Sequence, residues 1–320
     1  MNNIPTVAEL GENESLRRTV SRLNGSEYAL VGSGDDSAVI KAKDGRFVVT
    51  TDTMIEGHDF RLDWSTGFDL GWKAVATNVS DVAAMGARPT SLVVAIAVPG
   101  STPITFLEEF ADGLKAACEA LAPGCGVVGG DLAASEKVFV SVTAHGDLEG
   151  REPILRSGAK PGDVLAVAGT LGRAAAGLAL LFSGDQDAIS AYDALVDVQK
   201  RPEPPISAGI GLRASSMLDL SDGLAKDAAR IAKASGVKLV INSKDLNGFE
   251  AMLDDVAMRL GVSSRDWVLG GGEDHSLLAT FAPGVELPRA FKPIGTVEVG
   301  SGVYLDSEQI AETGWDSITG

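Results

Sequence analysis

Apolar residues in the first half of the chain recur with the periods of helices and strands in turn. Behind Thr6, a potential N-cap, they recur at helical spacing and predict a first helix that ends near Leu23. The same patterns predict two further helices, at 68–85 and 103–121, and four strands, at 38–41, 46–53, 91–98 and 138–144. Asp44-Gly45 is the signal of a tight hairpin between the first two strands. The unbroken Val, Ile and Leu content of 91–98 predicts burial on both faces.

The second half restarts this pattern after Gly and Pro residues at 146–153, which are typical of a boundary. We therefore predict two domains, over 1–147 and 148–320, in an α/β (α+β) fold. The strands expected in the second domain lie at 164–168, 217–220, 237–241, 277–281, 293–299 and 303–305, with helices after 172 and over 223–234. The prolines of 202–205 predict a rigid surface connection.

Composition narrows the class of protein. The 320 residues are 45% apolar and include 38 glycines, which fits a folded protein rather than a disordered one. Because 44 acidic residues outweigh 27 basic ones, the net charge of −17 makes nucleic acid an unfavourable partner. Cys118 and Cys125 match no CxxC or zinc pattern and are expected to be buried thiols in a reducing cytoplasm. We expect neither a signal peptide nor a membrane helix, since the longest uncharged run, 91–107, contains Pro and Gly.

Five separated segments place small residues beside Asp or Glu and next to apolar runs. They are Gly32–Ile40, Thr50–Thr53, Gly129–Asp131, Asp219–Gly223 and Gly271–Asp274. If the fold brings them together, each pair of carboxylates at about 4 Å costs roughly 4 kcal/mol at an effective dielectric near 20. Cations would remove that cost, and oxygen ligands select Mg²⁺, which binds through carboxylates and substrate phosphates. The sequence therefore predicts a site for metal-complexed phosphates.

Two of these predictions depend on which way side chains point. On a strand, Thr50 and Asp52 share one face and Thr51 lies on the other, and a position at the strand's C-terminal end would offer a carboxylate and a hydroxyl to metal. On the helix that follows, Lys73, Thr77 and Asp81 form a sparse polar stripe with Asn78 beside it. The stripe is either buried toward a ligand or simply a solvated face.

Each acidic segment also has a simpler interpretation. Asp35 and Asp36 fit an Asx-turn, the paired glycines of 129–131 and 271–274 fit hairpin turns, and one of Asp219 and Asp222 fits a helix N-cap. Otherwise paired glycines let the backbone approach a phosphate. The three histidines match no catalytic signature, and no GxxxxGK[ST] sequence is present, so the phosphate site is not a P-loop.

Longer motifs add a resemblance that covers nearly the whole chain. GDDSAVI, TTDTMIEGHDF, WKAVATNVSDVAAMGARP, LRSGAKPGD, GTLGRAAAGLALL, LDLSDGLAKD and GGEDHSLL resemble the thiamine-monophosphate kinase family, in the superfamily of aminoimidazole ribonucleotide synthetase and selenophosphate synthetase. The chain differs from the usual family pattern at Asp59, where His is frequent, at His275, where Tyr is frequent, and at the closing Gly314–Ile318. The reactive N-terminal Cys or selenocysteine of selenophosphate synthetases is missing.

The resemblance implies ATP-dependent phosphorylation of thiamine monophosphate to thiamine diphosphate with several Mg²⁺ ions, in a cytoplasmic homodimer. It implies a two-domain synthetase-like fold whose N-terminal sheets form a dimeric barrel, with a mixed C-terminal sheet and helices completing the active site. The implied metal ligands are Asp36, Thr50, Thr51, Asp52, Asp81, Asp131, Asp219 and Asp222, whose carboxylates are also the implied catalytic groups. The implied ATP contacts are Gly130, Asp131, Arg156 and Ser221, and the implied thiamine-phosphate contacts are Asp59, Glu273 and Trp315.

A phosphate oxygen as nucleophile agrees with the residues themselves, because it is already ionised near neutral pH and needs no general base. Two alternatives stay open from the sequence. One is another ATPase of the superfamily, such as aminoimidazole ribonucleotide synthetase. The other is a non-catalytic nucleotide or metal sensor that kept the acidic segments.

Overall fold

A computed structural model describes residues 4–33, 37–43 and 45–315 of the chain. It divides into two compact units. Unit 1 contains Met1–Val82 and Ala87–Arg151, and unit 2 contains Ala83–Gly86 and Glu152–Gly320. No described helix is both long enough and apolar enough to cross a membrane.

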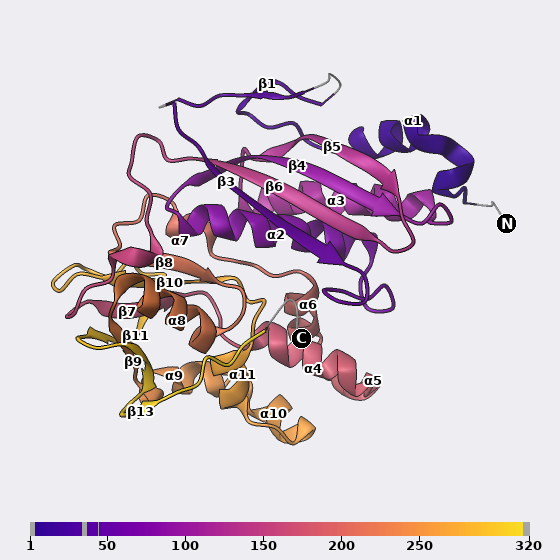
Figure 1. Ribbon diagram of the computed structural model, residues 1–320. Coiled ribbons are helices and arrows are strands. Elements are labelled where there is room, and N and C mark those ends of the chain that lie inside the picture. Colours follow the sequence, from indigo (N-terminus) through magenta and orange to yellow (C-terminus); the bar gives the residue numbers. More distant parts are fainter. Residues whose placement is uncertain (1–3, 34–36, 44, 316–320) are drawn as a thin grey trace. The chain divides into compact units, whose positions relative to one another are not determined.

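Unit 1 is a small sheet with helices (Figure 1). Its helices are α1 (Val7–Val20), α2 (Gly67–Ala84) and α3 (Ile104–Leu121). Its strands are β1 (Ala29–Val31), β2 (Val39–Ile40), β3 (Val48–Ile55), β4 (Arg88–Val98), β5 (Gly126–Ala134) and β6 (Phe139–Asp147). The predicted first helix is confirmed, with Thr6 as its N-cap: Glu9 N donates to Thr6 Oγ1 at 3.3 Å and Thr6 N donates to Glu9 Oε2 at 2.8 Å.

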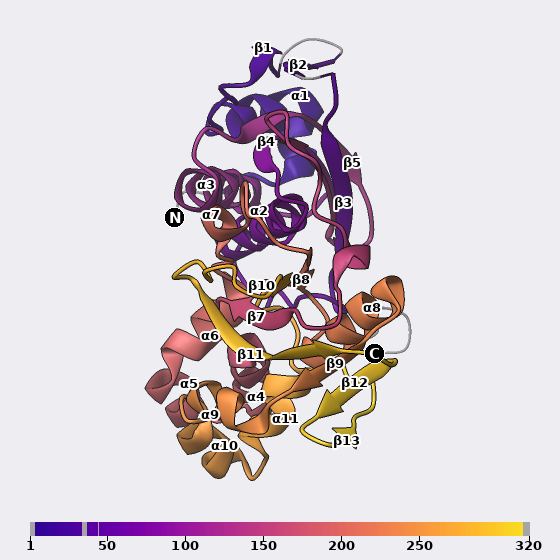
Figure 2. The same cartoon turned by 90° about the vertical axis from the view of Figure 1, so that its left-hand side faces the viewer.

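The main sheet of unit 1 has the order β3-β6-β4-β5. The β4–β5 pair is parallel and the other pairs are antiparallel, with Thr51, Thr143 and Val93 in register across three strands. Helices α2 and α3 lie side by side along one face of this sheet (Figure 2). Side chains on that face are buried, while alternate residues face the other way and remain accessible. This sheet therefore has one covered and one open face.

Two predictions for unit 1 are wrong, and one strand was missed. Strand β2 pairs with β1, and β3 pairs with β6, so the hairpin expected around Asp44-Gly45 is wrong; Asp44 itself lies outside the described residues. Strand β4 is buried on one face only, since Val93 is 37% exposed while Leu92 is fully buried. Strand β5 was not predicted, because two adjacent glycines are weak strand formers.

Unit 2 is built on a larger sheet. Its strands are β7 (Val164–Ala168), β8 (Ser216–Leu220), β9 (Lys238–Ile241), β10 (Ser276–Phe281), β11 (Phe291–Glu298), β12 (Gly302–Leu305) and β13 (Glu308–Gln309). Its helices are the 3-10 turn η1 (Arg156–Gly158), α4 (Arg173–Ser183), α5 (Gln186–Ala191), α6 (Asp193–Lys200), α7 (Ile206–Gly209), α8 (Leu224–Ser235), α9 (Ser243–Glu250), α10 (Asp254–Leu260) and α11 (Ser264–Gly270).

The sheet of unit 2 has the order β13-β12-β9-β11-β7-β10-β8, and every pair is antiparallel except β12–β9. Strand β10 and its neighbour β8, which forms one edge of the sheet, are buried at every residue, and Phe281 meets Phe291 edge to face with ring centroids 5.1 Å apart. Helix α8 contacts β8, β9 and β12, and α9 contacts β11. Helices therefore pack against this sheet, and its β10–β8 side is buried.

The six strands predicted for this half are confirmed, as are the helices after 172 and at 223–234. The prolines of 202–205 do not lie on the surface as expected, because Pro202 and Pro204 are buried. Helices α5, α6, α7, α9, α10 and α11 were not predicted. Cys118 and Cys125 are buried free thiols, as expected.

Candidate functional site

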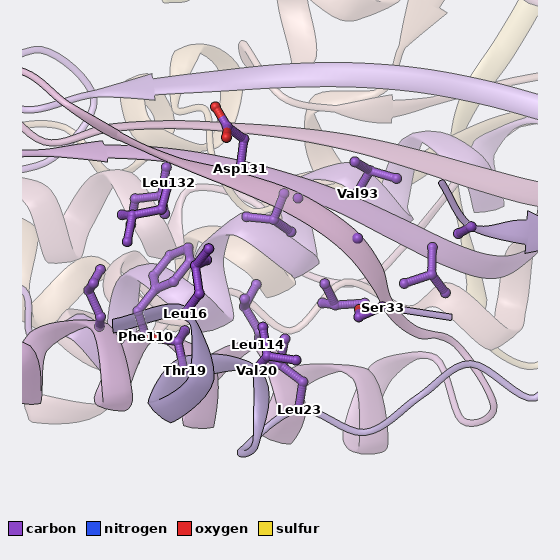
Figure 3. A pocket seen from close by; sticks show the side chains of 18 of the residues that line it. Leu16, Thr19, Val20, Leu23, Ser33, Val93, Phe110, Leu114, Asp131 and Leu132 are labelled. Atoms are coloured by element: carbon purple, nitrogen blue, oxygen red, sulfur yellow. The ribbon is translucent and has the colours of Figure 1, made fainter. Parts of the chain in front are cut away.

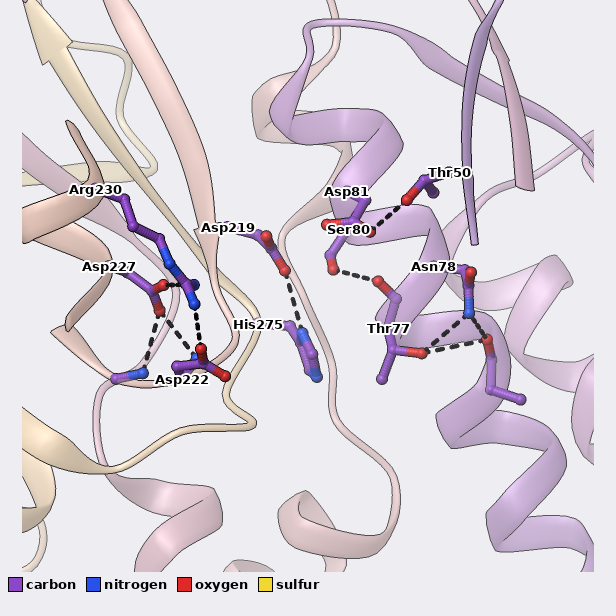
Figure 4. A network of polar contacts seen from close by, with 12 residues as sticks. Thr50, Thr77, Asn78, Ser80, Asp81, Asp219, Asp222, Asp227, Arg230 and His275 are labelled. Carbon is purple, nitrogen blue, oxygen red and sulfur yellow. Dashed lines mark hydrogen bonds and ion pairs between the residues drawn. The ribbon is translucent and has the colours of Figure 1, made fainter. Parts of the chain in front are cut away.

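In unit 1, strand β3 and helix α2 bring two predicted metal ligands into contact. Thr50 Oγ1 donates to Asp81 Oδ2 at 2.8 Å (Figure 4). Asp52 lies on the same face of β3 as Thr50, whereas Thr51 lies on the open face and its hydroxyl donates to Val142 O at 2.9 Å. The predicted division of faces is thus confirmed. These residues lie in the middle of β3, not at its C-terminal end, because the strand continues to Ile55.

The polar stripe of α2 is buried rather than solvated. Lys73, Thr77 and Asn78 are 3%, 8% and 1% exposed. Asn78 Nδ2 donates to Ala74 O at 3.0 Å, and Asn78 Oδ1 accepts no hydrogen bond from the described residues. Because these side chains are buried, the solvated-face interpretation is wrong. Burying a polar side chain costs free energy unless the side chain is hydrogen-bonded.

Gly129, Gly130 and Asp131 lie in edge strand β5, so the hairpin-turn interpretation of this segment is wrong. A Cβ on Gly130 would lie 2.0 Å from Val94 O, which explains this glycine by the close approach of β4. A Cβ on Gly129 would meet nothing within 4 Å. Open space therefore lies beside Gly129, and the backbone of Gly130 is exposed even though β4 leaves no room for a side chain there. Asp131 is exposed.

A cavity of about 750 Å³ lies beside this strand. Apolar side chains of α1 and α3 fill its wall, among them Leu16, Val20, Phe110 and Leu114, and β5 borders it from Val127 to Leu132 (Figure 3). The sequence did not predict this cavity, because its lining comes from segments more than 100 residues apart. In the sequence, the apolar faces of α1 and α3 were the one sign of this cavity.

In unit 2, Asp219 at the end of β8 meets His275. His275 Nδ1 lies 3.2 Å from Asp219 Oδ2, and each residue is 5% exposed. Because an ionised carboxylate only accepts, the imidazole donates from Nδ1 in this contact. His275 is thus a buried residue that contacts a predicted metal ligand.

The next acidic residue, Asp222, is surrounded by cations. Its carboxylate pairs with Arg230 and lies 3.4 Å from Lys226 Nζ. Helix α8 begins after Gly223 and has no side-chain cap, so the N-cap interpretation of Asp219 or Asp222 is wrong.

Asp227, which the sequence reasoning missed, fixes this turn instead. It is fully buried, accepts from Asp222 N at 2.9 Å and Gly223 N at 3.1 Å, and pairs with Arg230. Burial raises the pKa of Asp227 to about 6, and Arg230 opposes that rise. Its position in LDLSDGLAKD, five residues after Asp222, was the available signal.

The same region of unit 2 gathers three more predicted site residues. Glu273 N donates to Ser221 O, and Trp315 N donates to Asp222 O, both at 2.9 Å. Trp315 is 39% exposed. A Cβ on Gly272 would lie 2.4 Å from Ser221 O, so this glycine is required for loop packing. Loops distant in sequence thus meet at one end of the unit 2 sheet.

Three further predicted residues, Asp36, Asp59 and Arg156, have other contacts or lie outside the described part of the chain. Asp36 lies outside the described residues. Asp59, in the turn after β3, accepts from Ile55 N at 2.7 Å through Oδ2. Arg156 opens η1, where its carbonyl accepts from Ser235 Oγ at 2.8 Å.

The donor chemistry fits Mg²⁺, although the described residues of neither unit form a complete cage. Among the described residues, no three His, Cys, Asp or Glu side chains lie close enough together to hold a metal ion. What the units offer are oxygen donors in small sets: Thr50 with Asp81, and Asp219 near Asp222. Oxygen-only sets suit Mg²⁺, which takes few protein ligands and completes its shell with water and substrate phosphate.

Comparison with known proteins matches this arrangement to one class. Residues 34–148 match the AIR synthase related protein, N-terminal domain, and residues 160–306 match the AIR synthase related protein, C-terminal domain. The chain is 43% identical to thiamine-monophosphate kinase of Mycobacterium tuberculosis over 98% of its length and 93% of that protein. It is 38% identical to the Corynebacterium glutamicum kinase over 92% of its length and 88% of that protein.

Solved structures agree. The chain matches a structure described as AaThiL complexed with AMPPCP and TMP at a TM-score of 0.79 and 32% identity, covering 96% of this chain and 97% of the other. The protein is therefore a member of the AIR synthase related proteins and, within them, belongs to the thiamine-monophosphate kinase family. The resemblance noted in the sequence motifs is confirmed.

Proposed function

We propose that this protein transfers the γ-phosphoryl group of ATP directly to thiamine monophosphate and releases ADP and thiamine diphosphate. The observation that carries the proposal is that similarity to curated kinases spans both units, including the loops that hold Asp219, Ser221, Asp222 and Glu273. A related structure with AMPPCP, an ATP analogue, and TMP supports the choice of both substrates. We expect the enzyme to act in the cytoplasm.

The proposed metal ligands are those implied by the family motifs: Asp36, Thr50, Thr51, Asp52, Asp81, Asp131, Asp219 and Asp222. Bound Mg²⁺ would neutralise charge on the phosphates as they approach each other. The protein's own contribution is to hold carboxylates in place: Thr50 fixes Asp81 through its hydroxyl, and His275 fixes Asp219 through Nδ1. Since the accepting phosphate oxygen is already ionised, no residue is assigned as a general base.

For ATP we propose contacts from Gly130, Asp131, Arg156 and Ser221. The cavity beside β5 supports a place for the adenine base, because its wall is apolar and its border runs along the open backbone at Gly129. For thiamine monophosphate we propose Asp59, Glu273 and Trp315. The accessible indole of Trp315 suits stacking on a cationic ring.

We also propose that the protein is a homodimer through unit 1. Within the described residues, β3 and β5 each pair with one strand only, so the sheet has two unpaired edges. Its open face exposes Val49, Ile55 and Val93. Exposed edges and apolar faces favour association, and joining β5 of each subunit to β3 of the other would close a barrel. The domain over 1–147 would then serve dimerisation and ATP and metal binding, and that over 148–320 would complete the site.

This arrangement would make the active site composite. Thr51 and Asp131 both face the open side of the sheet, but two strands separate β3 from β5 and Asp131 is in register with Thr53, which puts Thr51 and Asp131 about 16 Å apart in one chain. Across the proposed barrel seam, Asp131 of the partner subunit would instead lie beside Thr51. The partner would therefore supply one of the proposed ligands.

Mixing two inactive variants tests the composite site. Asp81→Asn and Asp131→Asn should each abolish transfer. Refolded together, random pairing should give mixed dimers with one wild-type site each, restoring about a quarter of wild-type activity. Absence of any recovery, with mixed dimers demonstrated by mass, would contradict the shared site.

Product analysis tests the proposed reaction itself. Thiamine monophosphate, ATP and Mg²⁺ should yield thiamine diphosphate and ADP in equal amounts. Turnover of ATP only with an aminoimidazole ribonucleotide precursor would favour the other superfamily reaction. Binding of ATP without any product would favour a sensor.

A further inference from the structure

Two residues just before β10 have a left-handed backbone although neither is glycine. The φ angle is 69° at Glu273 and 48° at His275. Among the described residues, the other non-glycine positions with positive φ are Glu149 and Asp306, both exposed turn residues. Side chains with a Cβ disfavour this region, so such a backbone persists only where neighbouring contacts impose it. The residue between the two, Asp274, is 5% exposed.

Backbone hydrogen bonds hold both strained residues against the end of β8. Glu273 N donates to Ser221 O at 2.9 Å, and His275 N donates to Leu220 O at 3.1 Å. These bonds hold the segment on the side that faces the end of β8. On its other side, the segment is held by the side chain of Asp274.

Asp274 joins the segment to the loop between β7 and α4. Thr170 Oγ1 donates to Asp274 Oδ1 at 2.6 Å. Thr170 N donates to Ser276 Oγ at 2.8 Å, and that hydroxyl donates to Thr170 O at 2.6 Å. Three polar contacts therefore tie one threonine to the residues on either side of His275.

The carboxyl of Asp274 is buried near the start of α4, whose N-cap, Gly172, has no side chain to offer. Burial raises the pKa of Asp274, and the Thr170 hydroxyl and the backbone amides of residues 172–174 oppose the rise. Asp274 Oδ2 is buried and accepts no hydrogen bond from the described residues, so Thr170 provides the hydrogen bond that holds this carboxyl. Relaxing φ at 273 or 275 would break that hydrogen bond, so the strained backbone and the buried carboxyl depend on each other.

We propose that Asp274 is a positioning residue that holds Glu273 in its strained conformation and thereby sets the affinity for thiamine monophosphate. The inference rests on the assignment of Glu273 to the substrate made above. It assigns Asp274 no contact with substrate. Its action runs from the Thr170 hydroxyl, through the carboxyl, to the backbone of its neighbour.

The test uses full-length Asp274→Ala, with Thr170→Val as a milder variant that keeps Asp274. Asp274→Ala should raise KM for thiamine monophosphate about tenfold or more and leave KM for ATP within twofold, and Thr170→Val should raise the former about threefold. Asp274→Asn, which keeps an acceptor for Thr170, should recover most of the affinity. Hydrogen exchange should speed up at the amides of Glu273 and His275 without any substrate present.

Thr280→Val is the matched control. It removes a buried hydroxyl from the same strand, where Thr280 Oγ1 lies 2.8 Å from Ser216 Oγ, away from the segment. It should lower the melting temperature and change neither KM. If Asp274→Ala and Thr170→Val behave like this control, or raise both KM values equally, the positioning role is overturned.

Glu273→Gln separates this inference from the assignment on which it rests. If Glu273→Gln leaves KM for thiamine monophosphate unchanged, the assignment of Glu273 fails, and the substrate part of the inference fails with it. If Glu273→Gln raises KM while exchange at 273 and 275 stays slow in Asp274→Ala, Asp274 does not position Glu273.

Discussion

The two sheets of this protein differ in how completely a single chain buries them. In unit 2, β8 and β10 are buried at every residue. In unit 1, residues of β3 and β4 alternate between a covered and an open face, and the open face exposes Val49, Ile55 and Val93. Folded proteins normally cover apolar faces of this kind. Unit 2 therefore buries β8 and β10 within one chain, whereas the sheet of unit 1 leaves one apolar face accessible, which is the face assigned to the proposed dimer.

The same contrast extends to the chemistry. The candidate ligands of unit 1 sit on regular elements, on the faces of β3 and β5 and on α2. In unit 2, Asp219 lies near the end of β8 and Asp222 in the loop that follows, which meets other loops where backbone strain and a buried carboxyl fix their shape. Unit 1 therefore fixes its ligands through sheet register, and unit 2 through loop contacts.

The largest effect that we expect tests the regular-element site. Asp81→Asn should reduce turnover at least a hundredfold, because it removes a charge from an oxygen-donor pair with Thr50. Asp69→Asn is a control on the same helix. Asp69 accepts a hydrogen bond from Thr66 N at 3.0 Å, so its loss should lower the thermal stability and leave turnover unchanged. Thiamine diphosphate formation and thermal melting measure both. Near-normal turnover of Asp81→Asn at saturating Mg²⁺ would remove Asp81 from the site.

Sequence patterns predicted most elements of both units because each depends on local periodicity. The errors concern pairing: Asp44-Gly45 is a sound local turn signal, yet β3 finds its partner in β6, about ninety residues away. Strand β5 was missed because Gly129 and Gly130 resemble a turn, and the need for glycine at 130 comes from Val94 of the neighbouring strand. Non-local contacts of this kind leave no periodic trace.

For the candidate site, motifs named the residues but not the groups that hold them. Asp227 and Asp274 are acidic residues inside quoted motifs, yet their role follows only from burial and from the amides they face. The same holds for His275, whose contact with Asp219 joins residues 56 positions apart. Sequence reasoning identifies candidate ligands more readily than the residues that hold those ligands in place.

The next largest effect concerns the open face of unit 1. Val93→Asp places a charge in the middle of this face and should convert the proposed dimer to monomers, with a loss of activity of about tenfold or more. Val299→Asp is the control, because Val299 is 85% exposed in unit 2 and should tolerate the same change. Sedimentation at micromolar concentration measures the assembly. A wild-type protein that sediments only as a monomer would contradict the proposed dimer and the contrast drawn between the two sheets.

A smaller effect is expected at the loop site of unit 2. Trp315→Ala should raise KM for thiamine monophosphate roughly tenfold, from a stacking contact of about 1 to 2 kcal/mol, and leave KM for ATP nearly unchanged. Lys226→Met makes a useful companion, because Lys226 Nζ donates to Trp315 O and anchors this segment. Steady-state kinetics with each substrate varied in turn decide the question. A lowered melting temperature with unaltered kinetics would mark Trp315 as a structural plug.

The smallest effect lies on the surface of unit 1, where Glu149 pairs with Arg88 and Arg151 at 2.8 Å each. Arg88 and then Arg151 lower the pKa of Glu149 below its usual 4.5. Because the folded pKa is depressed, the ionised pair stabilises the protein above pH 4.5 and that stability disappears as pH falls through the folded value.

Glu149→Gln should therefore lower the free energy of unfolding by about 0.5 kcal/mol at pH 7, the range of exposed ion pairs, and by nothing measurable near pH 3. Glu136→Gln, exposed in the turn between β5 and β6, should change neither value. Urea unfolding at the two pH values provides the measurement. If Glu149→Gln lowers the free energy of unfolding equally at the two pH values, the side chain stabilises unit 1 by packing rather than by charge. The surface of unit 1 would then resemble the tightly packed loops of unit 2.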